Sequence, residues 1–427
     1  MAPSPVSMPR GAEFVSDDEI VLASAAVECG ADSCAAAPSR AYVRAGPRAT
    51  VALGDGSSAA IMTCGGLCPG LNTVVQEVAR ALEAQYGVRR IYGVQGGFRG
   101  LAAGRLEPLV VSPSLYSSGG TVLGTSRGAA DAGEMADVLE SFGIDAVFIV
   151  GGDGTIRGAS ALCAELSRRK SKVCVAVVPK TIDNDIPLID RSFGFDTAVA
   201  AAKKAVDCAV VEARSFPRGV AVVRLMGRGA GFLATHAALA APGDVDVVLV
   251  PEQGFALQGT GGLLEYVKKT LDRRGNACIV VAEGVGARIG GEAEDVGLWL
   301  CAQLKDHFQD DPVSIKYVDP TYMVRALPSD AADTILCARL AANAVHGAGA
   351  GFTDFAVATI NTHYAYVPLG EFANRKNLIA VSGRLWADVV RSTGQPTFGE
   401  TDDAFEDAQC DDAGETPAGG CVVSYDA

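Results

Sequence analysis

Short apolar runs alternate along the chain with stretches whose apolar positions follow a helical period. Each run has the length of a buried strand and is followed by glycine or polar residues. The predicted strands lie at 59–63, 144–150, 173–178, 220–225, 245–250 and 277–282. The predicted helices cover 71–82, a stretch that ends near 168, 197–211 and 329–345. Strands that alternate with helices predict an α/β fold with mainly parallel sheets and right-handed crossovers.

The composition fits a protein with a sizeable core. Of the 427 residues, 49% are hydrophobic and 20% are charged, and this length suits two domains or one large α/β unit. The net charge of −14 disfavours a nucleic-acid or membrane-surface binder, because both need a basic patch. No apolar run approaches the ~20 residues that span a membrane. A phosphorylated substrate stays compatible with this charge, because a local cluster of arginines can outweigh the global field.

The ends of the chain differ in character from the middle. Residues 1–50 are rich in Ala, Ser and Pro, and we expect an arm on the surface or on a neighbouring subunit. Residues 399–427 are acidic, and we expect a disordered tail. Early acids at 17–19 disfavour a secretory or mitochondrial signal. We expect a cytoplasmic protein, with a plastid location as the alternative. The twelve cysteines show no paired metal spacing, so we expect reduced core residues of an intracellular protein.

Two glycine loops each stand between a predicted strand and a predicted helix. Gly65 and Gly66 follow the first strand, and Gly151 and Gly152 follow the second. Without Cβ atoms, their backbone N–H groups can approach a phosphate at a helix N-terminus. Asp153 in the second loop could hold Mg²⁺ on a nucleotide phosphate. The alternative is that Asp153 caps the helix.

The densest group of polar residues follows the strand at 173–178. It reads Pro-Lys-Thr-Ile-Asp-Asn-Asp over 179–185. Phosphoryl transfer to an alcohol needs a base for the hydroxyl proton and positive charge near the transferred group. Asp183 is the better candidate for the base. Thr181 and Asp185 can orient substrate and metal, and Lys180 can contact phosphate. The alternative is a turn with solvated charges.

Taken in order, these motifs resemble the phosphofructokinase family. The motifs are 65–72, 151–155, 179–185, Met-Gly-Arg at 226–228 and Pro-Glu at 251–252. The stretches 316–325 and 42–48 are similar to the plant and trypanosome-like branch of ATP-dependent 6-phosphofructokinases. The resemblance covers about 40–398. The Gly-Gly-Asp-Gly-Thr string alone also occurs in proteins that resemble lipid kinases and NAD kinases, so it does not identify the acceptor.

The resemblance implies a fold and an assembly. We expect two similar Rossmann-like three-layer lobes with mainly parallel sheets and an active site in the cleft between them. The donor lobe would comprise 51–194 and about 324–375, and the fructose 6-phosphate lobe 195–323 and about 376–398. Family members form tetramers or dimers, so we expect a homo-oligomer, and the family includes allosteric enzymes of glycolysis.

The resemblance also implies roles for individual residues. Asp183 would be the general base that takes the proton from the 1-hydroxyl of fructose 6-phosphate. Asp153 and Asp185 would lie at Mg²⁺, and Thr181 and Arg127 would assist catalysis. The donor phosphates would contact Gly65, Gly66, Arg127, Gly152, Asp153, Gly154, Thr155 and Lys180. The sugar phosphate would contact Thr181, Asp183, Asp185, Met226, Gly227, Arg228, Glu252, Lys316, Tyr322 and Arg325.

Two positions bear on the phosphoryl donor. Pyrophosphate-dependent relatives carry Asp where Gly154 stands, and this Gly leaves space for the α-phosphate of ATP. Lys180 is typical of pyrophosphate-dependent relatives, whereas many bacterial members have Gly there. The plant-like ATP branch combines this Gly with this Lys, so we expect ATP as donor, with fructose 1,6-bisphosphate and ADP as products. The alternatives are a pyrophosphate-dependent enzyme and a non-catalytic regulatory subunit.

Overall fold

The computed structural model describes residues 1–6, 13–23, 40–110, 112–289, 295–372 and 376–398. The chain divides into two compact units. Unit 1 comprises Met1–Ala198 and Arg325–Asn377, and unit 2 comprises Val199–Val324 and the chain from Leu378 onward. The functional assignment of the two lobes stays a prediction. The expected active site in a cleft between the two lobes also stays a prediction.

Unit 1 is built on one large mixed sheet. Its strands, in spatial order, are β2 (Ile20–Leu22), β3 (Ala41–Arg44), β15 (His363–Pro368), β14 (Phe355–Ile360), β9 (Cys174–Pro179), β8 (Ala146–Gly151), β5 (Ser58–Thr63), β6 (Arg90–Val94) and β7 (Leu106–Pro108). From β14 to β6 the neighbours run parallel, and the strands outside them are antiparallel. A separate pair joins β1 (Ala2–Pro3) to β4 (Thr50–Val51).

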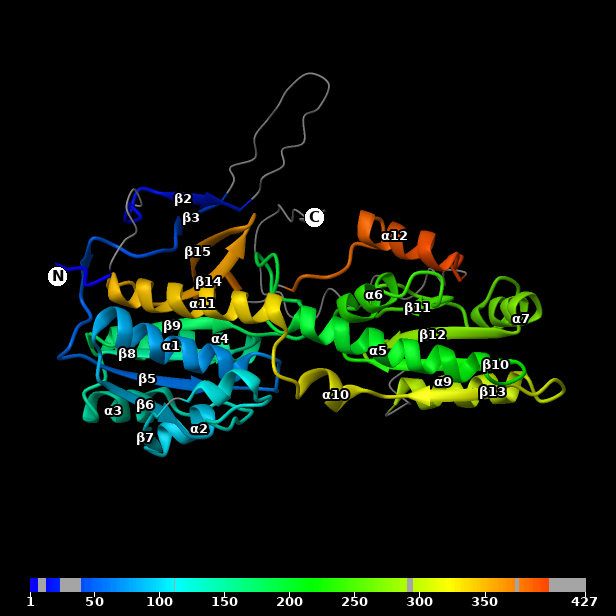
Figure 1. Cartoon of the computed structure of the whole chain (residues 1–427), viewed down its shortest axis with the longest axis horizontal. Coiled ribbons are helices and arrows are strands. Elements are labelled where there is room, and N and C mark those ends of the chain that lie inside the picture. Colours follow the sequence, from blue (N-terminus) through cyan, green and yellow to red (C-terminus); the bar gives the residue numbers. More distant parts are fainter. Residues whose placement is uncertain (7–12, 24–39, 111, 290–294, 373–375, 399–427) are drawn as a thin grey trace, which may run out of the picture. The chain divides into compact units, whose positions relative to one another are not determined.

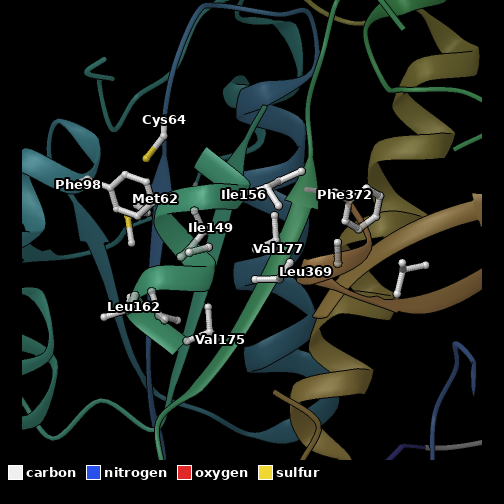
Figure 2. Packing of buried hydrophobic residues seen from close by; sticks show 14 of the residues in the cluster. Met62, Cys64, Phe98, Ile149, Ile156, Leu162, Val175, Val177, Leu369 and Phe372 are labelled. Carbon is white, nitrogen blue, oxygen red and sulfur yellow. The ribbon is translucent and has the colours of Figure 1, made fainter. Parts of the chain in front are cut away.

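Helices cover both faces of this sheet. They are α1 (Leu71–Tyr86), α2 (Gly97–Ala102), α3 (Ala132–Ser141), α4 (Asp153–Arg168) and α11 (Ala331–Gly349), with 3₁₀ turns at Pro113–Ser117 and Leu369–Phe372. Figure 2 shows Ile156 and Leu162 of α4 packed against Ile149 and Val177 of the sheet. Helices α1 and α11 lie side by side on the opposite face (Figure 1). Every residue of β8 and β9 is buried, so both faces of the sheet are covered at these two strands.

Unit 2 has a smaller sheet in which all neighbours are parallel. Its order is β11 (Val247–Leu249), β12 (Asn276–Ala282), β10 (Gly219–Leu225) and β13 (Ser314–Val318). Helices α7 (Leu263–Arg274) and α9 (Val296–His307) share one apolar core with it. Helices α6 (Phe232–Leu239) and α12 (Arg384–Thr393) contact its other face. The remaining elements are α5 (Phe195–Arg214), α8 (Val285–Arg288) and α10 (Thr321–Arg325).

The structure confirms the α/β prediction and the strand and helix runs read from the sequence. It adds elements that the apolar pattern did not reveal, among them β6, β13 and the β14–β15 hairpin. Part of the N-terminal stretch joins the sheet, because β3 pairs with β15 and β2 pairs with β3. The acidic tail lies outside the described residues. None of the described helices is long and apolar enough to cross a membrane.

Candidate active site

Three polar loops of unit 1 follow three neighbouring parallel strands, β5, β8 and β9. Backbone hydrogen bonds join the loops at this edge, from Cys64 N to Val150 O at 2.8 Å and from Lys180 N to Gly151 O at 3.0 Å. The carboxyl ends of parallel strands meet at one edge, which is where open α/β sheets bind ligands. The two glycine loops and the loop 179–185 therefore lie side by side.

The first glycine loop leaves space that side chains would fill. Gly65 has a φ of +85°, and a Cβ built on it would lie 3.9 Å from Lys180 Nζ and 4.0 Å from Thr155 Oγ1. A Cβ built on Gly66 would lie 3.7 Å from Arg127 Nη2. The first loop thus faces an ammonium, a hydroxyl and a guanidinium. This is a set of donors that suits phosphate oxygens.

The loop that carries Arg127 is fastened to the first glycine loop. Gly65 N donates to Ser126 O at 3.0 Å, and Thr125 Oγ1 donates to Gly65 O at 2.7 Å. Ser126 Oγ also donates to Gly96 O at 2.7 Å. Arg127 itself is exposed. Its backbone is therefore held at the glycine loop while its side chain can reach a ligand.

Lys180 is a buried cation at this edge, with 6% of its surface exposed. Burial lowers the pKa of its ammonium, and the nearby Asp183 carboxylate acts in the opposite direction. Across the described part of the chain, Lys180 forms no ion pair within 4 Å. A buried ammonium is costly without an anionic partner. A phosphate group beside Gly65 would supply that partner.

The loop that contains Asp183 is held by its own polar groups. Thr181 Oγ1 donates to Asp185 Oδ1 at 2.7 Å and accepts from Asp183 N at 3.2 Å. Thr181 N donates to Ser192 Oγ at 2.9 Å. Asn184 has a φ of +53°, and its side chain accepts from Ser192 N at 2.8 Å. The loop is thus a defined structure rather than a turn with solvated charges.

Asp153 and Asp185 lie close enough to influence each other. The pKa of Asp153 is raised, first by burial and then by the Asp185 charge, while Arg157 and Lys376 act to lower it. Gly152 is the N-cap of α4, and Asp153 is the first residue of the helix, so the capping alternative does not hold. Two neighbouring carboxylates fit Mg²⁺, which is usually bound by one or two carboxylates and substrate phosphates.

Unit 2 also gathers its motifs at the carboxyl edge of its sheet, since Met226–Arg228 follow β10 and Glu252 lies beyond β11. Glu252 is buried, with 8% of its surface exposed. Its two oxygens accept from Gly231 N at 3.0 and 3.1 Å, and Oε1 also accepts from Ile379 N at 3.1 Å. Glu252 therefore holds the N-terminus of α6 in this structure.

Four further candidates differ in their surroundings. Tyr322 on α10 is 73% exposed, and the Arg228 side chain is 77% exposed. Lys316 lies in the middle of β13, and its Nζ is 3.4 Å from the centroid of the Phe216 ring. Arg325 ends α10 and begins the second segment of unit 1. Each unit thus assembles its own part of the predicted site.

Sequence reasoning assigned no role to several charged residues at these edges. Arg157 and Lys376 act on Asp153 in unit 1. Arg224, Glu283 and Asp319 form ion pairs at the edge of the unit 2 sheet. Glu283 and Asp319 directly follow strands β12 and β13. Acidic residues directly after strands were therefore the sequence signal that could have revealed this group of ion pairs.

The phosphofructokinase family model matches residues 58–348. The chain belongs to the phosphofructokinase family. ATP-dependent 6-phosphofructokinase 1 of Arabidopsis thaliana is 46% identical over 377 residues, which cover 84% of this chain and 80% of the relative. ATP-dependent 6-phosphofructokinase of Trypanosoma cruzi is 36% identical over 373 residues, which cover 82% of this chain and 75% of the relative.

Solved structures of phosphofructokinases share the fold. The phosphofructokinase from Saccharomyces cerevisiae has a TM-score of 0.62 at 27% identity, and the match covers 74% of this chain and 45% of that chain. The pyrophosphate-dependent phosphofructokinase from Marinobacter aquaeolei has a TM-score of 0.68 at 20% identity, covering 82% of this chain and 94% of that chain. The predicted two-lobed, Rossmann-like architecture is therefore that of the family.

Proposed function

We propose that this phosphofructokinase is an ATP-dependent 6-phosphofructokinase. It transfers the γ-phosphoryl group of ATP to the 1-hydroxyl of fructose 6-phosphate and forms fructose 1,6-bisphosphate and ADP. The observation that carries the proposal is the convergence of the glycine loops and the loop 179–185 at one sheet edge of unit 1. The names of the relatives support the acceptor and the donor.

In the proposed mechanism, Asp183 accepts the proton of the 1-hydroxyl as the new O–P bond forms. Thr181 orients the Asp185 carboxylate through its hydroxyl. Arg127 and Lys180 place positive charge near the donor phosphates, where negative charge shifts during transfer. Asp153 and Asp185 would hold Mg²⁺, which when bound would neutralise phosphate charge. The presence of all these groups disfavours a non-catalytic regulatory subunit.

The donor assignment rests on the space beside Gly154. This residue is exposed, and a Cβ built on it would meet Arg157 Nη2 at 3.9 Å and, apart from its chain neighbours and the nearby backbone of its own helix, no other atom of the described residues within 4 Å. The position can therefore admit the α-phosphate of ATP. A carboxylate here would fill the space and repel a third phosphate. Likeness to the pyrophosphate-dependent structures at 20% identity concerns the fold and does not favour that donor.

The sugar phosphate would be held by Met226, Gly227, Arg228, Glu252, Lys316, Tyr322 and Arg325. The exposure of Arg228 and Tyr322 leaves both side chains accessible to a ligand. Arginine suits a phosphate dianion because its planar guanidinium can donate two parallel hydrogen bonds. A homo-oligomeric assembly, allosteric control and a cytosolic rather than plastid location remain further predictions. Two relatives from Arabidopsis thaliana, ATP-dependent 6-phosphofructokinase 4 and ATP-dependent 6-phosphofructokinase 5, are named as chloroplastic.

A coupled assay for fructose 1,6-bisphosphate tests the proposal. Purified protein is given fructose 6-phosphate and Mg²⁺ with either ATP or pyrophosphate. Turnover with ATP and none with pyrophosphate supports the proposal. Turnover with pyrophosphate alone would assign the donor to the alternative. A folded protein that is silent with both donors would contradict catalysis and favour the regulatory alternative.

A further inference from the structure

One partly buried arginine of unit 2 lies among three acids at the carboxyl edge of its sheet. Arg224 is the last residue but one of β10, and its side chain is 16% exposed. Its Nη1 lies 2.8 Å from Asp319 Oδ2, and its Nη2 lies 3.1 Å from Glu283 Oε2. Its Nε lies 3.8 Å from Asp295 Oδ1. Arg224 precedes the Met-Gly-Arg motif but belongs to none of the motifs read from the sequence.

The positions of these acids follow from the sheet topology. Strands β12 and β13 flank β10, and all three run parallel. Glu283 directly follows β12 and Asp319 directly follows β13. The guanidinium of Arg224 therefore bridges the ends of the two flanking strands. A planar guanidinium can address two carboxylates in different directions, whereas an ammonium is a single point charge.

On one side, Arg224 acts on the helix that carries Tyr322. Asp319 pairs with Arg224 through Oδ2. Through Oδ1 it accepts hydrogen bonds from the backbone N–H and the hydroxyl of Thr321. Thr321 is the first residue of α10. The pair thus fixes the start of the helix from which Tyr322 extends into solvent.

On the other side, Arg224 acts on the Met-Gly-Arg loop. Glu283 Oε2 pairs with Arg224, and Glu283 Oε1 lies 3.5 Å from Arg228 Nε. Backbone bonds tie the same segments together, from Glu283 N to Leu225 O and from Gly284 N to Gly227 O, both at 2.9 Å. Arg224 and Arg228 thus contact opposite oxygens of one carboxylate.

We propose that Arg224 is a positioning residue for fructose 6-phosphate, which aligns α10 with the Met-Gly-Arg loop and neutralises the acids between them. The inference rests on the proposed function, because it assigns a purpose to the residues expected to hold the sugar phosphate. Arg224 acts through Asp319 and Glu283 and does not itself touch the substrate.

The charges explain why the substrate phosphate depends on this arginine. Glu283, Asp295 and Asp319 bring three carboxylates to the edge where Arg228 and Tyr322 are expected to bind a dianion. Without Arg224, these carboxylates would repel the phosphate and each other, and Glu283 would compete for Arg228. A purely structural ion pair would affect folding but would leave the affinity for the sugar phosphate unchanged.

Steady-state kinetics of Arg224→Gln and Arg224→Lys test the inference. Removal of a residue that supports a binding group commonly lowers affinity or activity on the order of 10- to 100-fold. For Arg224→Gln we therefore expect the KM for fructose 6-phosphate to rise by about that factor. The KM for ATP should change little. Arg224→Lys should have an intermediate KM for fructose 6-phosphate, because a lysine keeps the charge but cannot bridge both acids.

Asp319→Asn provides a second variant that keeps an oxygen to cap α10 while it removes the charge from the pair. We expect its KM for fructose 6-phosphate to rise as well. In the double variant that combines Asp319→Asn with Arg224→Gln, this KM should rise by less than the product of the two single increases. The reason is that both changes break the same interaction. Independent, multiplicative effects on this KM would contradict the inference.

Arg274→Gln is the matched control. Arg274 pairs with the buried Asp246, which directly precedes β11 and so lies at the amino edge of the same sheet. This variant should lose thermal stability while its KM for fructose 6-phosphate stays that of the wild type. The inference is overturned if Arg224→Gln behaves in the same way. If the wild-type protein does not phosphorylate fructose 6-phosphate, the proposed function itself fails, which is a different result.

Discussion

Thr181 Oγ1 donates a hydrogen bond of 2.7 Å to Asp185 Oδ1. The same oxygen accepts from the backbone N–H of Asp183 at 3.2 Å. One hydroxyl therefore links the proposed general base to the proposed Mg²⁺ ligand. Because a hydroxyl can donate only one hydrogen, these two bonds fix its direction. The hydroxyl thus holds the Asp183 backbone and the Asp185 carboxylate in one arrangement.

Removal of this hydroxyl should slow catalysis. Thr181→Val keeps the shape of the side chain but leaves Asp185 without its donor. A hydrogen bond to a charged group contributes about 1.5–3 kcal/mol, which corresponds to a loss in kcat of roughly 10- to 100-fold. Thr181→Ser keeps the hydroxyl and should stay within a few-fold of the wild type. Equal kcat values for the Val and Ser variants would exclude this role.

Asp183→Asn tests the proposed base. An amide cannot take up the hydroxyl proton, so kcat should fall by about 10²- to 10⁴-fold. Binding of ATP, measured by isothermal titration calorimetry, should change little. Asp190→Asn is a suitable control, because Asp190 accepts from the backbone of Asn361 and Thr362 at 3.0 and 2.8 Å. A fully active Asp183→Asn enzyme would mean that another group accepts the proton.

Gly154→Asp tests the donor assignment. The backbone at Gly154 can carry a side chain in open space, so we expect the variant to fold with an unchanged Tm. A like charge beside the α-phosphate costs several kcal/mol, so kcat/KM for ATP should fall by on the order of 100-fold or more. Gly154→Ala adds a methyl group without charge and separates the steric effect from the electrostatic one. Undiminished activity of Gly154→Asp with ATP would refute the argument.

The sequence located the strands and the polar loops because both depend on local patterns. Apolar runs such as 173–178 identify buried strands, and parallel strands bring their carboxyl ends together. The pairing of the β14–β15 hairpin with β9 and β3 could not be predicted in this way, since pairing partners far apart in sequence leave no local pattern. The antiparallel edge of the unit 1 sheet was missed for this reason.

Side-chain roles that depend on tertiary contacts were also beyond the sequence. Glu252 was expected to hold the sugar, and the structure shows that its carboxylate accepts from Gly231 N and Ile379 N. Lys316 was expected near the 6-phosphate, and its ammonium lies over the Phe216 ring. Neither contact excludes the proposed role. Both contacts involve partner residues that are distant in the sequence and belong to no motif.

A buried histidine gives the protein a specific sensitivity to acid. His346 on α11 is buried, and its Nδ1 lies 2.9 Å from Tyr86 Oη. Burial lowers its pKa from 6.5 to about 4, and the charge of Arg48 adds to this effect. Between these two values the unfolded chain binds a proton that the folded protein does not. The stabilisation is therefore complete above about pH 6.5 and is lost as the pH falls toward 4.

The expected size of this effect follows from the shift. A lowering of the pKa by roughly 2.5 units corresponds to a loss of about 3 kcal/mol in the free energy of unfolding between pH 7 and pH 4. In His346→Gln, urea denaturation followed by circular dichroism should show a correspondingly smaller loss over this range. His363→Gln, a change at an exposed histidine, should keep the pH dependence of the wild type. If His346→Gln and the wild type lose stability equally between pH 7 and pH 4, the buried histidine is not the acid-sensitive group.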